Sequence, residues 1–269
     1  MSEDLFERYR VRGNSFRLDE LDPGDKAGFD CEKACDVLNH NRDKIAELQN
    51  RLMAEKSQAL LVILQAMDTG GKDPTIRDVL DRVNSQACRV TKFKKENDQD
   101  KRYDHLRRFH LAVPAKGEMG VFNRAYYDDL IRDHAHDEKS EAELAVPYRQ
   151  INDFERLLDE ERVRVIKIFL HISKEEQKRR LQERIEDPER HWELSESDFR
   201  ERKFWDGYMR AYEHAIRTTN TEWAPWFAVP SDVRWFRDAA ASEIIARALE
   251  ELDPQYPPPK IDLSKVELD

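Results

Sequence analysis

The chain has 269 residues, and its 46 lysine and arginine residues against 56 aspartate and glutamate residues give a formal net charge of −10. That negative balance disfavours a protein that binds duplex nucleic acid through its overall field. The longest strictly apolar run, residues 59–64, is far shorter than the roughly 20 residues that span a bilayer, and residues 1–13 lack the apolar centre of a signal peptide. Three cysteines without a disulfide framework fit a reducing compartment. We therefore expect a cytoplasmic protein with no membrane or duplex nucleic-acid partner.

Short apolar runs that are typical of buried strands alternate along the chain with segments of helical periodicity. In chain order, the predicted strands are residues 59–64, 89–93, 119–122, 163–172 and 226–229. The predicted helices are residues 32–56, 76–83, 98–111, 124–133, 141–161, 174–187, 197–218 and 232–252. This alternation predicts an α/β fold in which helices flank both faces of a parallel five-stranded sheet.

No segment between these elements has the composition of a linker, so we expect one domain over residues 1–269. Residues 1–30 are polar and hold three of the eight glycines, which predicts an irregular arm. Residues 174–218 separate the fourth and fifth predicted strands and are expected to form a helical insertion that acts as a lid. Pro188 should end the first helix of this insertion, because proline interrupts the backbone hydrogen-bond ladder.

The segment between the first predicted strand and the next helix carries the clearest chemical signal. Residues 65–73 are QAMDTGGKD, so two adjacent glycines precede a lysine at the start of a helix. Backbone N–H groups at a helix start bind anions, and a lysine there reaches the outer phosphates. The match to the usual phosphate-loop pattern is partial, because Ala66 replaces its first glycine and an aspartate its hydroxyl residue. We interpret Gly70, Gly71 and Lys72 as phosphate-binding residues, with a ligand-free glycine turn as the alternative.

Asp68 lies inside this candidate anion-binding loop. A carboxylate there would repel phosphate unless a cation lay between them. Mg²⁺ held by Asp68 and phosphate oxygens resolves the conflict, because Mg²⁺ prefers hard oxygen ligands. The alternative is a solvated aspartate in a turn.

Asn123 and Arg124 directly follow the third predicted strand. In a doubly wound sheet the carboxyl ends of the strands border one crevice, so this pair should lie beside the phosphate loop. Arg124 is suited to clamp phosphate oxygens with two parallel hydrogen bonds. The alternative for Arg124 is a surface ion pair with Asp128.

Two basic stretches in this acidic chain suggest a track for a polyanion, with solvated helix faces as the alternative. The second stretch lies in the helical insertion, where Arg180 and Arg184 are four residues apart and should share a helix face. The two stretches consist of Lys92, Lys94, Lys95, Lys101, Arg102, Arg107 and Arg108, and of Lys178, Arg179, Arg180, Arg184, Arg190, Arg200, Arg202 and Lys203.

The sequence resembles the polyphosphate kinase 2 family over nearly its whole length and in matching order. The motifs that carry the resemblance are residues 8–11, 16–18, 65–73, 90–94, 122–127, 187–192 and 224–226. The resemblance implies a P-loop kinase fold with a helical lid, and phosphoryl transfer between inorganic polyphosphate and nucleotides with Mg²⁺. The Asn-Arg pair followed by two tyrosines is similar to the subgroup that phosphorylates both nucleoside mono- and diphosphates. Family members are typically dimers or tetramers, so a homodimer or homotetramer is implied.

The resemblance places the functional residues of the family on positions of this chain. Those positions are Asp68, Lys72, Lys94, Asn123, Arg124 and, in the lid, Arg184. We predict a Mg²⁺-dependent polyphosphate:nucleotide phosphotransferase in which Asp68, Lys72 and Arg124 are catalytic and Arg180 assists Arg184 in binding polyphosphate. Two alternatives stay open: an ATP-dependent P-loop kinase of small molecules, and a degenerate relative that binds polyphosphate or nucleotide without turnover.

Overall fold

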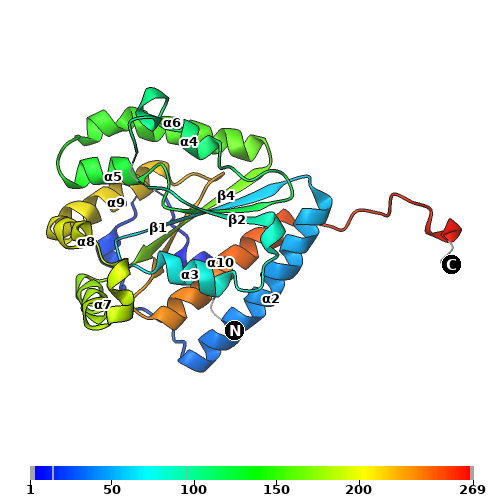
Figure 1. Cartoon of the computed structure of the whole chain (residues 1–269), viewed down its shortest axis with the longest axis horizontal. Coiled ribbons are helices and arrows are strands. Elements are labelled where there is room, and N and C mark those ends of the chain that lie inside the picture. The colour runs from blue at the N-terminus through cyan, green and yellow to red at the C-terminus, as the bar shows by residue number, and fades with distance from the viewer. Residues whose placement is uncertain (1–3, 14, 95, 267–269) are drawn as a thin grey trace.

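The computed structural model describes residues 4–13, 15–94 and 96–266. Its centre is a five-stranded sheet with the order β2-β3-β1-β4-β5, in which every neighbouring pair is parallel. The strands are β1 (Ala59–Ala66), β2 (Cys88–Lys92), β3 (Met119–Asn123), β4 (Val163–His171) and β5 (Trp226–Pro230). Helices cover the sheet on both sides (Figure 1). The predicted α/β class with a parallel five-stranded sheet is confirmed.

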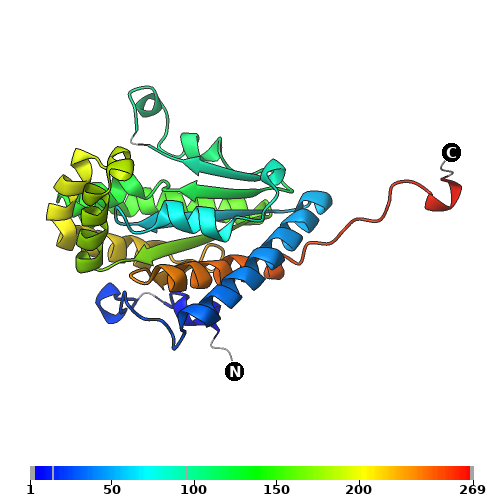
Figure 2. The same cartoon turned by 60° about the horizontal axis from the view of Figure 1, so that its bottom comes forward.

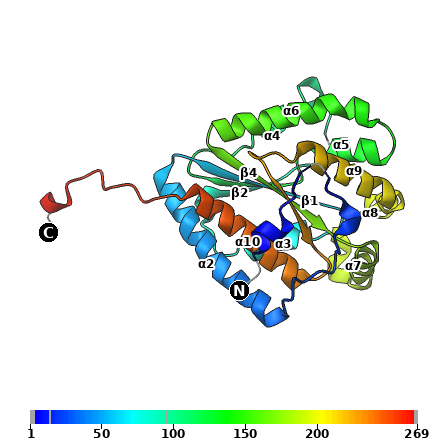
Figure 3. The same ribbon diagram turned by 180° about the vertical axis from the view of Figure 1, so that it is seen from behind.

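The helices form two layers around the sheet. They are α1 (Leu5–Tyr9), α2 (Cys31–Glu55), α3 (Lys72–Val79), α4 (Arg107–His110), α5 (Asp128–Ala135), α6 (Glu141–Glu160), α7 (Lys174–Glu186), α8 (Glu196–Glu201), α9 (Trp205–Thr219) and α10 (Arg234–Leu252). Figure 2 shows α2 and α10 together beneath the sheet, and Figure 3 shows α5, α6 and α9 on the opposite side. Short 3-10 turns are Leu18–Glu20, Ser85–Ala87, Asp100–Arg102, Pro188–Glu193, Arg202–Phe204 and Leu263–Lys265.

The central strand β1 is buried along its whole length, which explains its continuous apolar sequence. Successive side chains of a strand point to opposite faces of the sheet. Leu61 and Ile63 therefore join the hydrophobic cluster formed with α5, α6 and α9. Leu60 and Val62 join the second cluster, formed with α2 and α10. The sheet separates these two cores and holds the carboxyl ends of its strands at one end.

The predicted helix over residues 98–111 is wrong. Only the 3-10 turn Asp100–Arg102 and the four-residue helix α4 form there. The side chain of Asn97 accepts hydrogen bonds from the N–H groups of Gln99 and Asp100, and that of Asp104 accepts one from Leu106. Such local side-chain acceptors compete with helical backbone bonding and break the segment into turns.

The arm over residues 1–30 is more ordered than its polar composition predicted. It contains α1, in which Phe6 packs against Phe227 of β5 and Tyr9 against Phe236 of α10. A helix of five residues is too short to show a repeated apolar period, so the sequence pattern could not reveal it.

Three other predicted helices are displaced or divided in the structure. The one expected over residues 76–83 is α3, which begins at Lys72 and ends at Val79. The one expected over residues 124–133 begins at Asp128, because Arg124 has φ of +71°, which is incompatible with a right-handed helix. The one expected over residues 197–218 consists of α8, a 3-10 turn and α9. Among the described residues, no helix is long and apolar enough to cross a membrane.

Candidate active site

The phosphate loop, residues 67–71, joins the end of β1 to the start of α3. Parallel register pairs Leu64 of β1 with Asn123 of β3, and the N–H of Arg124 donates to the Leu64 carbonyl at 3.2 Å. The sheet therefore brings the loop and the Asn-Arg pair to the same edge, as expected for carboxyl ends of neighbouring parallel strands.

Both glycines of the phosphate loop are required by close contacts. A Cβ atom on Gly70 would lie 2.6 Å from the Cβ of Ala66, and one on Gly71 would lie 2.2 Å from Nη1 of Arg237. Gly71 also has φ of +108°, a conformation that side-chain-bearing residues rarely adopt. The hydroxyl of Ser231, which directly follows β5, donates a hydrogen bond to the Gly70 carbonyl at 2.6 Å and so links the loop to the end of β5.

Lys72 opens α3, as predicted, and its side chain folds back into the loop. It is buried, and Nζ donates to the Ala66 carbonyl at 2.8 Å and lies 3.4 Å from the carbonyl of Met67. Burial, followed by repulsion from the charge of Arg124, lowers the pKa of Lys72 to about 8. A phosphate that reaches this ammonium replaces a neutral carbonyl acceptor by an anionic one, which adds an ionic attraction to the hydrogen bond.

Arg124 pairs with the loop aspartate across the two strand ends. Its Nη2 lies 2.7 Å from an Asp68 carboxylate oxygen, and both side chains border the same cavity. The alternative partner, Asp128, instead accepts hydrogen bonds from the Ala125 N–H at 2.7 Å and from the Gln65 side chain at 2.9 Å. Arg124 therefore faces the phosphate loop, and its charge is balanced there by a carboxylate.

Asn123 and Asp73 form a second link between β3 and the start of α3. The Asn123 side-chain amide donates to Asp73 at 2.7 Å, and Lys92 lies 3.2 Å from the same carboxylate. Asp73, which stands where a phosphate loop usually has a hydroxyl residue, is thus held by a cation and an amide. Lys94 is exposed and lines the rim of the cavity.

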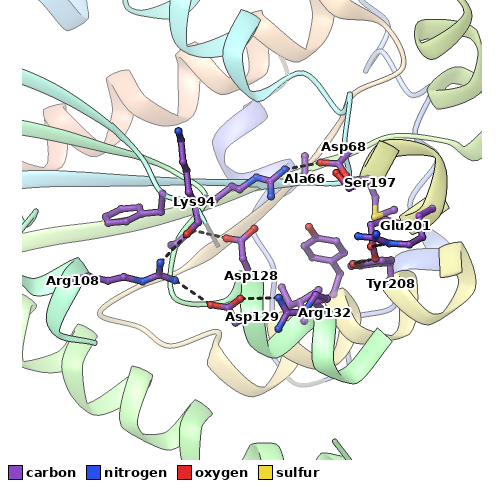
Figure 4. Close-up of a pocket in the computed structure, with 17 residues that line it drawn as sticks. Ala66, Asp68, Lys94, Arg108, Asp128, Asp129, Arg132, Ser197, Glu201 and Tyr208 are labelled. Atoms are coloured by element: carbon purple, nitrogen blue, oxygen red, sulfur yellow. Dashed lines mark hydrogen bonds and ion pairs between the residues drawn. The ribbon is translucent and has the colours of Figure 1, made fainter. Parts of the chain in front are cut away.

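The cavity beside the phosphate loop has a volume of about 220 Å³. One wall is a row in which Asp129 bridges Arg108 at 3.1 Å and Arg132 at 3.2 Å (Figure 4). The opposite wall comes from α8 and α9 and includes Ser197, Glu201, Tyr208 and Tyr212. The cavity therefore offers cations, carboxylates and aromatic rings around one space, so it can contact both the charged and the ring parts of a ligand.

Sequence reasoning singled out Arg108 only as part of a basic stretch and missed Asp129, Arg132 and Tyr208. For Asp129 and Arg132 the usable signal was their place on the helix that follows the end of β3, where side chains face the crevice, whereas Tyr208 on α9 had no such signal. Arg237 is buried beside the phosphate loop, and no pattern in the sequence around it indicates this position.

Residues 174–204, here called the lid, stand over the carboxyl ends of the strands (Figures 1 and 2). The side chain of Gln177 in α7 donates to the Asp68 carbonyl at 2.9 Å, which fixes the lid to the phosphate loop. α9, which the predicted insertion included, belongs to the core instead, because Ala211, Ala215 and Ile216 are fully buried.

Arg180 lies one helical turn before Arg184 on α7, as the spacing predicted, but its side chain is buried. It is 5% exposed, and its guanidinium donates to the carbonyl of Thr69 at 3.1 Å, to those of Ser231 and Asp232, and to the Glu176 carboxylate. The reason is that α7 lies against the loop along the side that carries Arg180. Its bonds connect the lid to the loop.

The residues at the cavity fit a magnesium ion that is completed by substrate. In the described part of the chain, no group of three or more His, Cys, Asp or Glu side chains converges as metal ligands. Asp68 nonetheless presents a carboxylate beside the phosphate loop, and Asp128 lines the same cavity. Mg²⁺ typically takes one or two carboxylates and fills its other positions with phosphates and water.

The family model described as Polyphosphate kinase 2 matches residues 30–257. The chain belongs to the polyphosphate kinase 2 family. A relative from Meiothermus ruber, named AMP/ADP-polyphosphate phosphotransferase, is 42% identical over 265 residues, which cover 96% of this chain and 98% of the relative. An ADP-polyphosphate phosphotransferase from Rhodopseudomonas palustris is 37% identical and covers 82% of this chain and 81% of its own.

The fold agrees with this membership. The crystal structure of polyphosphate kinase 2 from Arthrobacter aurescens TC1 has a TM-score of 0.93 and 38% identity, covering 98% of this chain and 95% of that one. The predicted family is therefore confirmed. The roles assigned to individual residues of this polyphosphate kinase 2 chain stay predictions.

Proposed function

We propose that this protein transfers phosphoryl groups between inorganic polyphosphate and nucleoside mono- and diphosphates. The observation that carries the proposal is its 42% identity, over 96% of its length, to a protein named AMP/ADP-polyphosphate phosphotransferase. The site supports the same chemistry, since Asp68 of the phosphate loop and Arg124 border a cavity lined by charged side chains and aromatic rings. Lys72 lies next to this cavity and donates to the carbonyl of Ala66, which lines it.

In this proposal the phosphate loop and Lys72 hold the phosphoryl group that moves. Backbone N–H groups at the start of α3 point toward the anion, and the Lys72 ammonium neutralises charge on its oxygens. Arg124, released from Asp68, binds the neighbouring phosphate and keeps the donor and acceptor oxygens in line. Phosphoryl transfer needs little more than such positioning and neutralisation, so no protein nucleophile is required.

Asp68 is the residue proposed to hold magnesium, and Asp128, which lines the same cavity, would assist it. When bound, Mg²⁺ would supply positive charge that stabilises the phosphoryl group during transfer. The Asp68–Arg124 ion pair then has to open. The Asp68 carboxylate turns to the cation, and the guanidinium turns to phosphate.

The cavity between α5 and α8 is proposed as the nucleotide site. Arg108 and Arg132 would bind acceptor phosphates, and Tyr208 offers a ring for contact with the nucleoside. Lys94 and the lid arginine Arg184 would guide the polyphosphate. We further propose a cytoplasmic homodimer or homotetramer, a location that fits the free thiols of all three cysteines.

Donor and acceptor profiling tests the proposal. Purified protein is incubated with Mg²⁺ and AMP, ADP, GMP or GDP, with either polyphosphate or ATP as the donor, and the products are separated by chromatography. We expect ADP and ATP to form from AMP and polyphosphate. Transfer from ATP to a small molecule, with none from polyphosphate, would establish an ordinary kinase, and polyphosphate binding without product would establish a non-catalytic relative.

A further inference from the structure

One carboxylate of the lid contacts two lid arginines at once. Glu193 ends the 3-10 turn Pro188–Glu193. It accepts hydrogen bonds from Nε of Arg190 at 3.2 Å and from Nη2 at 3.0 Å, and its Oε2 lies 3.0 Å from Nε of Arg184. Carboxylates and phosphates are bound by arginine with the same fork geometry, so Glu193 occupies a place that also suits a phosphate.

The contact with Arg184 is incomplete. Its Nε is buried, yet no acceptor is aligned for a hydrogen bond with it among the described residues. The pair is therefore held by charge alone, and the N–H remains available to a better-placed oxygen. An arginine that serves only to stiffen the lid would gain by satisfying this buried donor.

Glu193 also lies close to the start of α3. The pKa of its carboxyl is lowered by the hydrogen bonds from Arg190 and by the charge of Arg184, while Asp73 in the first turn of α3 opposes this shift. Glu193 is thus a carboxylate that interacts electrostatically with the first turn of α3, which follows the phosphate loop.

We propose that Glu193 is an internal competitor of polyphosphate: its carboxylate fills the Arg184–Arg190 subsite in the free protein, and a phosphate of the incoming chain displaces it. This inference rests on the proposed function. A short anion that merely replaces one carboxylate gains little from the exchange. A long polyanion stays attached at its other phosphates while the exchange occurs, so it displaces the Glu193 carboxylate more readily than a short anion does. Glu193 therefore makes the site selective for long chains.

The chain offers a matched control in Glu189. It lies on the same 3-10 turn and is exposed, and within the described residues its carboxylate forms no ion pair. Glu189→Gln and Glu193→Gln change the net charge of the lid equally. Only Glu193→Gln frees Arg184 and Arg190, so a difference between the two variants reports the subsite and not the overall charge.

The experiment is calorimetric titration of each variant with tripolyphosphate and with long-chain polyphosphate, without nucleotide, followed by steady-state kinetics. Glu193→Gln should bind polyanion about fivefold more tightly, the size expected for removing one or two half-exposed ion pairs. The gain should be larger for tripolyphosphate than for the long chain, and the KM for nucleotide should not change. Glu189→Gln should resemble the wild type in each measurement.

Unchanged or weaker polyanion binding by a Glu193→Gln protein with a normal melting temperature would overturn the inference, because Glu193 would then only order the lid. If that variant does not fold, Glu193→Asp keeps the charge and shortens its reach. A smaller gain in affinity supports competition, and a loss overturns it. Wild-type protein that transfers nothing from polyphosphate would instead refute the proposed function, which the direct titrations do not depend on.

Discussion

The phosphate loop and the lid both gather positive charge at the carboxyl end of the sheet, but they hold it differently. In the loop, Lys72 is buried and donates to main-chain carbonyls, within a backbone that two glycines permit. In the lid, Arg184 and Arg190 share the carboxylate of Glu193. The loop is therefore set by backbone geometry before any ligand arrives, whereas Arg184 and Arg190 of the lid become available to an anion only when their ion pairs with Glu193 open. We infer that the loop serves the chemistry and the lid serves capture.

The largest expected effect comes from a substitution in the phosphate loop and tests whether the loop serves the chemistry. Lys72→Ala should reduce kcat by about 10³, or about 4 kcal/mol, because it removes the charge that meets the transferring phosphoryl group. Steady-state kinetics at saturating polyphosphate and nucleotide, with circular dichroism to verify folding, measures it. Lys92→Ala removes an exposed lysine next to the loop and should cost far less. Near-normal turnover in a folded Lys72→Ala protein would contradict the assignment of residues 67–71 and Lys72 as the phosphate-binding loop.

The next effect belongs to the lid. Arg184→Ala should raise the KM for polyphosphate roughly ten- to a hundredfold, the range of one charge-assisted contact, and leave the KM for nucleotide nearly unchanged. The effect should shrink at high salt, where exposed charges are already screened. Arg179→Ala is the control, because Arg179 lies on the same helix but pairs with Glu176 and Glu183. Equal effects of both variants would show that the lid acts only through its net charge.

The pH dependence of kcat/KM tests the role of Lys72 in the phosphate loop. Since the pKa of Lys72 is lowered to about 8, kcat/KM for polyphosphate should be level below that pH and fall about tenfold per unit above it. In the unfolded chain the lysine keeps its proton to near pH 10.5, so between about 8 and 10.5 this group makes the free energy of unfolding rise with pH. The predicted loss is therefore not caused by Lys72-linked unfolding. A kcat/KM for polyphosphate that stays constant up to pH 10 would contradict the proposed role of the Lys72 ammonium.

A smaller effect concerns metal at the loop. Asp68→Asn should raise the Mg²⁺ concentration for half-maximal activity on the order of tenfold, because an amide replaces a hard anionic oxygen. A magnesium titration of the rate measures this. Asp73→Asn makes the same charge change in the first turn of α3, where Lys92 and Asn123 hold the carboxylate, and should leave the midpoint unchanged. An identical shift in both variants would mean that Asp68 acts only through the general field.

The comparison also explains what the sequence could predict. The parallel sheet and the phosphate loop were predictable, because continuous apolar strands and adjacent glycines follow from backbone requirements that leave a local pattern. The lid was predictable only as a region of dense charge. The sequence around Arg180 and Arg184 does not show that the two residues differ. In the structure the guanidinium of Arg180 donates to a carbonyl of the loop, whereas Nε of Arg184 is a buried donor without an aligned acceptor. Their difference arises from how α7 docks, which is a tertiary property.

The failed helix over residues 98–111 has a similar cause. Its apolar spacing is helical, but Asn97 and Asp104 provide side-chain acceptors that capture nearby N–H groups. The row formed by Arg108, Asp129 and Arg132 depends in turn on where α5 begins, and the left-handed Arg124 delays that start. The exact arrangement of this wall of the cavity therefore depends on backbone geometry that the apolar spacing does not reveal.

The most direct test of the division between loop and lid is kcat for Lys72→Ala and Arg184→Ala, measured side by side at saturating polyphosphate, AMP and Mg²⁺. If the loop performs the transfer and the lid captures the chain, Lys72→Ala stays slow by about 10³ while Arg184→Ala returns to nearly the wild-type rate. A collapse of kcat in Arg184→Ala to the level of Lys72→Ala, with both proteins folded, would contradict that division and place Arg184 in the transition state.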